Sequence, residues 1–224
     1  MRAWALLPCF AMFIAGGVAA QPAGAAKPGW PSVGDRWIYD VRDADHPDRK
    51  YQIVVEVQEV ASSTISDVVI PEDDTRVEQS SSVRQRHQAG PYLIGAGSGV
   101  IIFAPYLRAF QELQPGMRWS NIDFVQLGAC SGLSSLTCTV NAHVVGREKV
   151  TVKAGTFDAW KIEVTISLRN TIGQGSQFGG VILLQYWYAE EVKRTVKSQS
   201  RTRGSWDQPD VDLELVSYQL KDSR

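Results

Sequence analysis

Apolar and polar residues alternate along much of the chain with a period of two, which is the pattern of a half-buried antiparallel strand. The longest run lies at residues 160–169, where five apolar residues alternate with polar ones: Trp160, Ile162, Val164, Ile166 and Leu168. Similar runs occur at residues 36–42 and 51–58. Between Leu215 and Val216 the apolar positions change parity, which predicts a β-bulge there.

Further strands are predicted by β-branched and aromatic residues at 64–70, 118–124, 139–145, 149–153, 181–188 and 211–220. A tight turn is expected at residues 153–156. The helical period appears once, where Tyr106, Phe110 and Leu113 follow Pro105. The sequence therefore predicts a mainly β protein, with about eleven to thirteen antiparallel strands and one or two short helices.

The N-terminal segment has the pattern of a secretory signal peptide. A basic start precedes an uncharged run that ends at Gly16, and small residues at 18–20 suit signal-peptidase cleavage after Ala20. The run is shorter than the roughly 20 residues of a spanning helix. We expect a signal peptide at 1–20, a flexible lead-in at 21–33, and one β domain at 34–224. The protein would then be periplasmic or secreted, with no transmembrane span after cleavage.

Export would determine the oxidation state of the cysteines. Cys9 would leave with the signal, so only Cys130 and Cys138 would remain in an oxidising compartment, where cysteines usually pair. Their C-x7-C spacing differs from the C-x-x-C of redox enzymes. We therefore expect a structural disulfide between them.

Charge and motifs argue against several functions. The net charge of −1 in 224 residues is unlike the basic excess of nucleic-acid-binding domains. His46, His87 and His143 form no H-E-x-x-H motif, and no serine lies in a G-x-S-x-G motif. We therefore expect no catalytic residues, no cofactor and no metal. The carboxylate pairs Asp73–Asp74 and Glu190–Glu191 leave a glycan hydrolase as the least favoured hypothesis.

An internal echo suggests two similar halves. Gly34-Asp35-Arg36-Trp37 recurs as Gly116-Met117-Arg118-Trp119, and both lie at the start of an expected strand. The glycine would form the turn, and the tryptophan would cover the core at the strand entrance. Halves at 34–112 and 113–224 would explain the echo, although coincidence is the alternative.

These residues also carry a family resemblance. The opening strand at 33–39, the L-Q-P-G-x-R-W run at 113–119, the V-x-V-x-A-G-T-F hairpin at 150–162 and the Y-W-Y-A strand at 186–189 resemble uncharacterised bacterial envelope proteins. Those proteins are distantly similar to the lipoprotein-carrier half-barrels. The resemblance implies a strongly curved antiparallel sheet, half-barrel or barrel-like, around a cavity closed by short helices, and it implies no catalytic residue. Lys153 replaces the proline that is usual in the hairpin turn.

A cavity could be lined by aromatic residues from the expected strands: Trp37, Tyr39, Trp119, Trp160 and Tyr186. Their alternate positions fit a filled core equally well. The segment around Tyr106 and Phe110 would form part of a lid. Four cations, Lys193, Lys197, Arg201 and Arg203, would share one face of an exposed strand. We expect that face to protect a sheet edge, and an anionic membrane surface is the alternative.

The first functional hypothesis is a non-enzymatic envelope protein that holds a lipid, another apolar ligand or a protein segment on its curved sheet. The second is a scaffold or accessory subunit of an envelope complex without a small ligand. A cavity lined by tryptophan and aliphatic groups would favour the first hypothesis, and a filled core would favour the second.

Overall fold

A computed structural model describes residues 29–46, 48–72, 82–95, 100–125, 136–170, 179–204 and 209–221. These residues form thirteen strands and one helix: β1 (Arg36–Asp43), β2 (Lys50–Val60), β3 (Thr64–Glu72), β4 (Val83–Gln88), β5 (Tyr92–Gly95), β6 (Ile101–Phe103), α1 (Leu107–Phe110), β7 (Arg118–Ser120), β8 (Asp123–Val125), β9 (Leu136–Val152), β10 (Gly155–Asn170), β11 (Gly179–Ala189), β12 (Arg194–Gly204) and β13 (Val211–Gln219). The mainly β class predicted from the alternation is confirmed.

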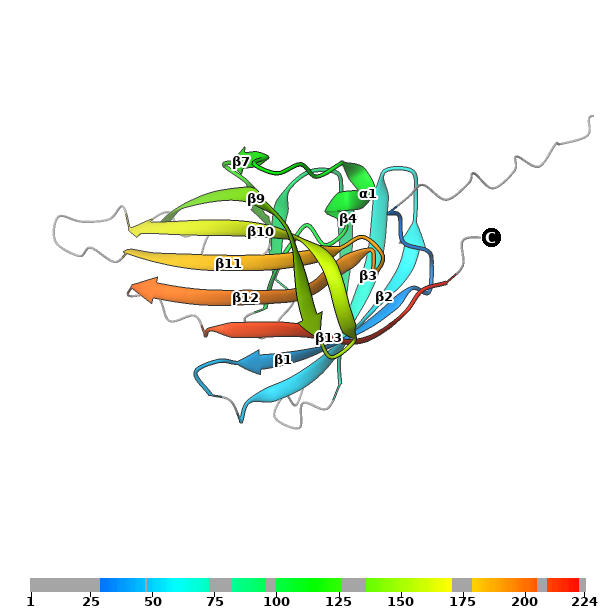
Figure 1. Cartoon of the computed structure of the whole chain (residues 1–224). Coiled ribbons are helices and arrows are strands. Elements are labelled where there is room, and N and C mark those ends of the chain that lie inside the picture. The colour runs from blue at the N-terminus through cyan, green and yellow to red at the C-terminus, as the bar shows by residue number, and fades with distance from the viewer. Residues whose placement is uncertain are drawn as a thin grey trace, which may run out of the picture.

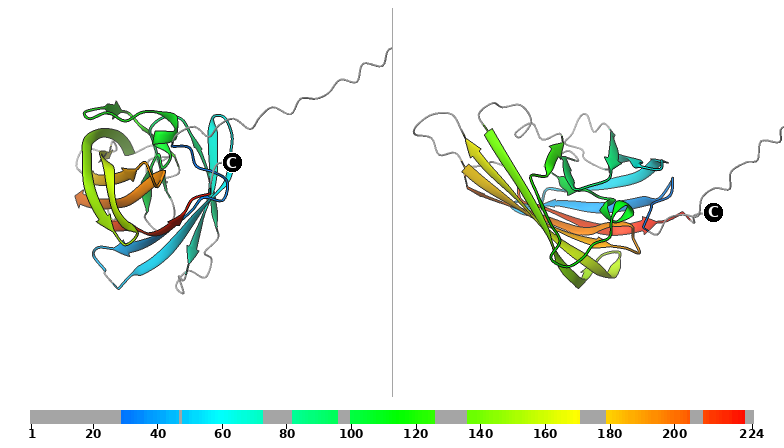
Figure 2. Two further views of the ribbon diagram at one scale, coloured as in Figure 1. Left: turned by 45° about the vertical axis from the view of Figure 1, so that its right-hand side comes forward. Right: turned by 90° about the horizontal axis from the view of Figure 1, so that it is seen from above.

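One curved antiparallel sheet forms the framework (Figures 1 and 2). Its ten strands run in the order β4-β3-β2-β1-β13-β12-β11-β10-β9-β7. The first strand pairs with the last one, β1 with β13, so both ends of the described chain meet in the middle of the sheet. In the described residues, β4 and β7 are the outermost strands and do not pair with each other, so the sheet is open rather than closed.

The alternation predicted the strand faces well. On β10 the apolar side chains of Ile162, Val164, Ile166 and Leu168 are buried, and the polar ones between them are half-buried or exposed. The bulge in β13 is confirmed. Ile38 lies opposite Ser217 and Tyr39 opposite Leu215, which leaves Val216 as the extra residue.

Three local predictions need correction. Residues 118–124 form two short strands in different sheets, because Asn121 has a positive φ of 54° and breaks the extended backbone between β7 and β8. Residues 139–145 and 149–153 belong to one long strand, β9, in which Val145 is a bulge residue. The helix is shorter than predicted and comprises the single turn Leu107–Phe110.

A small sheet fills the concave side of the large one. Its order is β6-β5-β8, and five of its side chains belong to the buried core: Leu93, Ile94, Ile101, Ile102 and Phe103. Figure 2 shows this green segment inside the curve of the strands β10–β13. Tyr186, on the inner face of β11, donates a hydrogen bond of 2.9 Å to the carbonyl of Ile101. The chain therefore supplies its own filling for the curved sheet.

The turn predicted at residues 153–156 is confirmed at the tip of the β9–β10 hairpin. Gly155 has a φ of 140°, in a region that residues with a side chain rarely adopt. The tip crosses in front of β11 and β12 (Figure 1), and the amide of Ala154 donates to the carbonyl of Leu215 on β13. An ion pair between Lys153 and Asp40 of β1 also holds the tip.

The two G-x-R-W segments share their turn but differ in depth. Gly34 and Gly116 have φ values of 84° and 78°, and each precedes a strand, as the sequence predicted. Trp37 lies on a central strand and is fully buried, whereas Trp119 lies on the outermost strand β7 and is half-buried.

Candidate functional site

The most unusual group of residues is a charged cluster inside the protein. Asp67 on β3, His87 on β4, Tyr106 just before α1 and Arg194 at the start of β12 are all buried, with exposed fractions of 0–2%. The same alternation that buries Ile65 and Val69 places Asp67 on the inner face of β3. Sheet curvature then brings β3 and β12, which are four strands apart in the sheet, into side-chain contact.

Asp67 is the centre of the cluster. Its Oδ2 accepts hydrogen bonds of 2.8 Å from Arg194 Nη1 and of 2.7 Å from the Tyr106 hydroxyl. Arg194 also donates to the Tyr106 hydroxyl oxygen. On the other side, His87 Nε2 lies 3.0 Å from Asp67 Oδ1, within ion-pair distance but not aligned for a linear hydrogen bond. The Asp67 carboxylate thus connects β3 with β12 and with the segment before α1.

Aromatic side chains enclose the cluster. The guanidinium carbon of Arg194 lies 4.8 Å from the ring centroid of Tyr106 and 5.4 Å from that of Trp37, which are cation–π distances. His87 Nδ1 lies 2.7 Å from the hydroxyl of Tyr92 on β5. The Tyr39 hydroxyl donates to the carbonyl of Thr195 at 2.8 Å.

The charges change the acidity of the cluster. Burial alone would raise the pKa of Asp67, but the positive charge of Arg194 and the contacts with His87 and Tyr106 lower that pKa to about 2. Burial raises the pKa of Tyr106 well above its ordinary value. Burial also disfavours charge on Arg194, yet Tyr106 and Asp67 keep its pKa above the ordinary value. Asp67 and Arg194 are therefore an ion pair at neutral pH.

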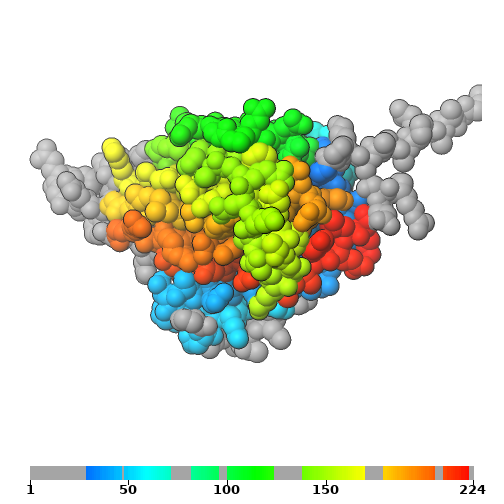
Figure 3. All heavy atoms as spheres, viewed as in Figure 1, coloured from blue at the N-terminus to red at the C-terminus, as the bar shows by residue number. Residues whose placement is uncertain are grey.

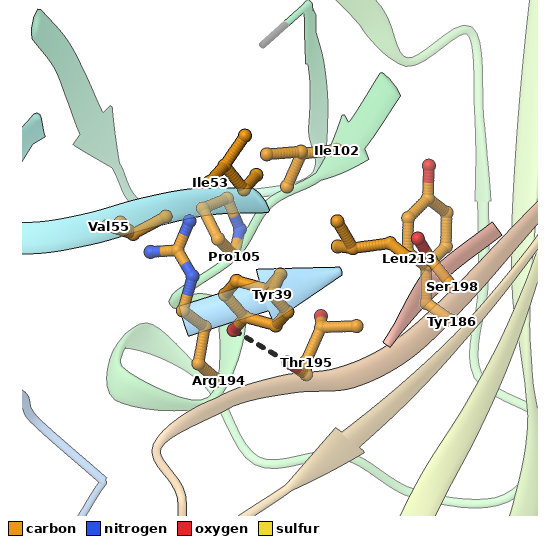
Figure 4. A pocket seen from close by; sticks show the side chains of 10 residues that line it. All are labelled: Tyr39, Ile53, Val55, Ile102, Pro105, Tyr186, Arg194, Thr195, Ser198 and Leu213. Carbon is orange, nitrogen blue, oxygen red and sulfur yellow. Dashed lines mark hydrogen bonds between the residues drawn. The ribbon is translucent and has the colours of Figure 1, made fainter. Parts of the chain in front are cut away.

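A small pocket adjoins Arg194 (Figure 4). Its volume is about 10 Å³, which is roughly the space that one water molecule needs. Its lining comes from β1, β2, β6, β11, β12, β13 and the segment before α1: Tyr39, Ile53, Val55, Ile102, Pro105, Tyr186, Arg194, Thr195, Ser198 and Leu213. The Arg194 guanidinium faces this space but is already paired with Asp67.

The cluster is built like a structural ion pair rather than a reaction centre. Asp67 Oδ2 faces the Arg194 guanidinium and the Tyr106 hydroxyl, Oδ1 faces the His87 imidazole, and no side chain of the cluster reaches the surface. Among the described residues, no group of three or more histidine, cysteine or acidic side chains could hold a metal ion.

The residues predicted to line one cavity lie in several places. Tyr39 and Tyr186 line the pocket in Figure 4. Trp37 packs on Arg194, and its indole N–H donates to the carbonyl of Val192. Trp119 contacts Phe103 of β6, with ring centroids 5.9 Å apart. Trp160 lies in the first half of β10, where its indole N–H donates to Glu190.

The two residues predicted for the lid have different environments. Tyr106 is fully buried in the charged cluster. Phe110, at the end of α1, packs edge-on against Trp30 with ring centroids 5.1 Å apart. The segment between them crosses the sheet interior and is anchored by Arg108, which pairs with Glu190 at 3.0 Å.

The expectation that one exposed edge strand carries all four cations is wrong. β12 lies between β11 and β13 in the large sheet, and only residues 201–204 extend beyond its pairing with β13. Lys193 precedes the strand in a turn, with a φ of 62°, and pairs with the buried Asp35 at 3.3 Å. Only Lys197, Arg201 and Arg203 share the outer face of β12, where Arg201 pairs with Asp212 at 2.7 Å.

Two predictions fall outside the described residues. Cys138 lies on β9 opposite Leu168, but Cys130 is not described, so the disulfide stays a prediction. The expected signal peptide at 1–20 is not described either. No helix of the described part of the chain is long and apolar enough to cross a membrane.

The charged cluster was missed from the sequence, although a signal exists. Asp67 interrupts an apolar face between Ile65 and Val69, and a charge in that position is buried and needs a partner. Arg194 was hidden in a run of basic residues, where nothing distinguishes a buried arginine from an exposed one.

No protein-family model matches the sequence, and no curated protein matches it. Three crystal structures show limited similarity. A protein from Parabacteroides distasonis described as a lipoprotein has 13% identity and a TM-score of 0.47, covering 87% of this chain and 100% of its own. An exported protein with a YmcC-like fold from Bacteroides fragilis has 13% identity and a TM-score of 0.47, covering 84% and 97%. The hypothetical lipoprotein YmcC from Escherichia coli has 12% identity and a TM-score of 0.35, covering 85% of each chain. With TM-scores below 0.5, these proteins assign neither a family nor a residue role to the chain.

Proposed function

We propose that the protein is a non-enzymatic, exported envelope protein that acts as a scaffold or accessory subunit of an envelope complex. It works through its outer surface and carries no small ligand. The observation that carries this proposal is the filled concave face of the large sheet. Tyr39 and Tyr186 face a pocket of about 10 Å³ there, because β5, β6 and the segment before α1 occupy the remaining space.

The filling is too well buried to act as a movable lid at low cost. The side chains of Ile101, Ile102 and Phe103 on β6 are only 2–5% exposed. Exposing them would cost about 1.5–3 kcal/mol for each side chain. The sum of about 5–9 kcal/mol is comparable to the whole stability of a typical domain. The interior therefore stays closed while the protein is folded.

The described polar groups support a non-enzymatic role. Glu190, one of the carboxylates considered for a glycan hydrolase, pairs with Arg108 and accepts a hydrogen bond from Trp160. Asp67 and His87 are buried away from any substrate. Export rests on the signal-peptide pattern at residues 1–20.

A carrier of an apolar ligand is the second candidate, and the lining of the pocket favours it. Most of the groups around the space are aliphatic or aromatic, including Ile53, Ile102 and Leu213. An acyl chain could enter only if β6 moved away from β12.

Native mass spectrometry of protein purified from the envelope distinguishes a scaffold without a ligand from a carrier of an apolar ligand. The scaffold proposal predicts the mass of the processed chain with no lipid adduct. It also predicts the same free energy of unfolding before and after refolding from denaturant, since no ligand would be lost. A stoichiometric lipid adduct, together with lower stability after refolding, would overturn the proposal in favour of the carrier. Ile102→Val is the control: it removes one methylene group from the pocket lining, and we expect it to keep the fold and to leave the adduct mass unchanged.

A further inference from the structure

The outer face of the large sheet carries two exposed arginines at one end. Two arginines on central strands, Arg169 of β10 and Arg203 of β12, are exposed there and form no ion pair within the described part of the chain. Some other cations of the outer face have acidic partners. Lys161 pairs with Glu163 at 3.7 Å, and Arg201 pairs with Asp212.

The register places the two arginines around an apolar centre. Arg169 lies opposite Gly179 of β11, while Val181 of β11 lies opposite Ser167 on one side and Arg203 on the other. Leu183 is the next outward residue of β11. We call Ser167, Arg169, Val181, Leu183 and Arg203 the arginine patch. No acidic residue is among them, and Val181 and Leu183 are half-exposed.

The backbones of β11 and β12 approach closely beside the patch. A side chain at Gly204 would place its Cβ 2.6 Å from the carbonyl oxygen of Gly179, so the ends of β11 and β12 approach more closely than other residues allow. Two strand spacings of about 4.8 Å separate β10 from β12. Arg169 and Arg203 therefore flank the apolar centre on the outer face of the sheet, whose yellow and orange strands are seen from outside in Figure 3.

Edge protection does not explain Arg169, because β10 is paired with a strand on each side at that position. At Arg203, β12 is paired with β11 alone, since its pairing with β13 ends at Ser200. An apolar centre flanked by arginines is instead suited to a surface that offers phosphate groups above an apolar layer. Arginine binds phosphate with two parallel hydrogen bonds, and basic residues near an anionic lipid surface strengthen attachment.

We propose that the arginine patch docks the protein onto an anionic phospholipid surface. Arg169 and Arg203 bind headgroup phosphates, while Val181 and Leu183 contact the layer below. This inference concerns the outer face and is independent of whether the interior holds a ligand.

Sedimentation with vesicles tests the proposal. We expect the exported protein to bind vesicles that contain phosphatidylglycerol, to bind pure phosphatidylcholine far less, and to lose binding at high salt. Arg169→Gln with Arg203→Gln should weaken binding about fivefold for each charge removed. The double variant Arg169→Lys with Arg203→Lys should retain most of it.

A matched control removes the same charge elsewhere. Arg84 and Arg86 on β4 are also exposed arginines, and Arg84→Gln with Arg86→Gln should leave vesicle binding unchanged. Equal thermal unfolding of all variants verifies that they fold. The proposal is overturned if the native protein does not bind anionic vesicles, or if the two glutamine variants bind equally well. It is also overturned if inorganic phosphate releases the protein more effectively than chloride of the same ionic strength, because free phosphate would then be the ligand.

Discussion

The interior of this protein has two regions with different chemistry. Where the later part of β10 pairs with the first part of β11, the inner face is aliphatic, and Val164, Ile166 and Leu184 are each about 1% exposed. Where β3 and β4 face the start of β12, the interior instead contains the ion pair of Asp67 and Arg194. Both regions come from strands with the same period of two. Alternation therefore determines which side chains point inward but not what they meet there.

The two regions also differ in what they specify. Aliphatic packing is tolerant, because a neighbouring side chain of similar volume can fill the same space. The charged cluster accepts fewer arrangements, since Asp67 must reach both Arg194 and Tyr106. It therefore fixes the segment before α1 against β3 and β12. We infer that the aliphatic region contributes most to the free energy of unfolding, and that the charged cluster sets the position of the segment before α1.

The largest expected effect is in the charged cluster. Asp67→Asn should destabilise the protein by about 3–5 kcal/mol, because it leaves the buried Arg194 without a counter-charge. Chemical denaturation at neutral pH measures the change. Asp40→Asn is the matched control, since it removes an ion pair with the exposed Lys153 and should cost at most about 1 kcal/mol. Equal costs for the two variants would mean that the cluster is not an ion pair.

In the aliphatic region, Ile166→Ala should cost about 2–5 kcal/mol, because it removes buried methyl groups and leaves a cavity. Thr165→Ala, one residue away on the outer face, should change the stability by less than about 0.5 kcal/mol. Denaturation curves of the two variants provide the comparison. Similar losses for both would show that the inner and outer faces of β10 are wrongly assigned.

The predicted disulfide would add a covalent constraint near the aliphatic end, where Cys138 lies opposite Leu168. Closing so short a loop between Cys130 and Cys138 should stabilise the protein by about 2–3 kcal/mol. Alkylation of the exported protein before and after reduction, followed by mass measurement, counts the free thiols. Two free thiols without reduction would refute the pairing.

The fold was largely predictable where the pattern is strong. The five repeats on β10 and the change of parity at Val216 gave correct faces and a correct bulge. Sequence reasoning failed where one residue redirects the backbone. Asn121 separates β7 from β8 through a positive φ, and no alternation signals such a change.

The candidate site was less predictable than the fold. The alternation correctly buried Tyr39 and Tyr186, but it could not show that β6 would occupy the space beside them. Lys197 and Arg203 were placed correctly on one face, whereas the expected edge strand was wrong, because the strand order depends on pairing far along the chain. Long-range pairing is decided by the whole chain and leaves little trace in a local pattern.

Acid should weaken the charged region selectively. The pKa of Asp67 is lowered from 3.8 to about 2, so its ionised form stabilises the folded state above pH 3.8, and this contribution is lost as the pH falls through about 2. The loss corresponds to about 2 kcal/mol. The difference in unfolding free energy between the native protein and Asp67→Asn should therefore shrink between pH 5 and pH 2. A constant difference over that range would contradict the lowered pKa.

The smallest effect concerns the outer face behind the aliphatic region. Lys161 points outward on β10, and alternation alone would make Lys161→Ala neutral. Its ammonium group, however, lies 5.4 Å from the ring centroid of Trp187, whose side chain is only 6% exposed. We therefore expect a loss of about 0.5–1 kcal/mol from the cation–π contact. Lys161→Arg should retain most of the stability, because a guanidinium stacks on indole at least as well as an ammonium. Denaturation followed by tryptophan fluorescence measures both variants. If alanine and arginine were equally neutral, the contact would be a solvated surface pair, and the outer face would contribute nothing to the burial of Trp187.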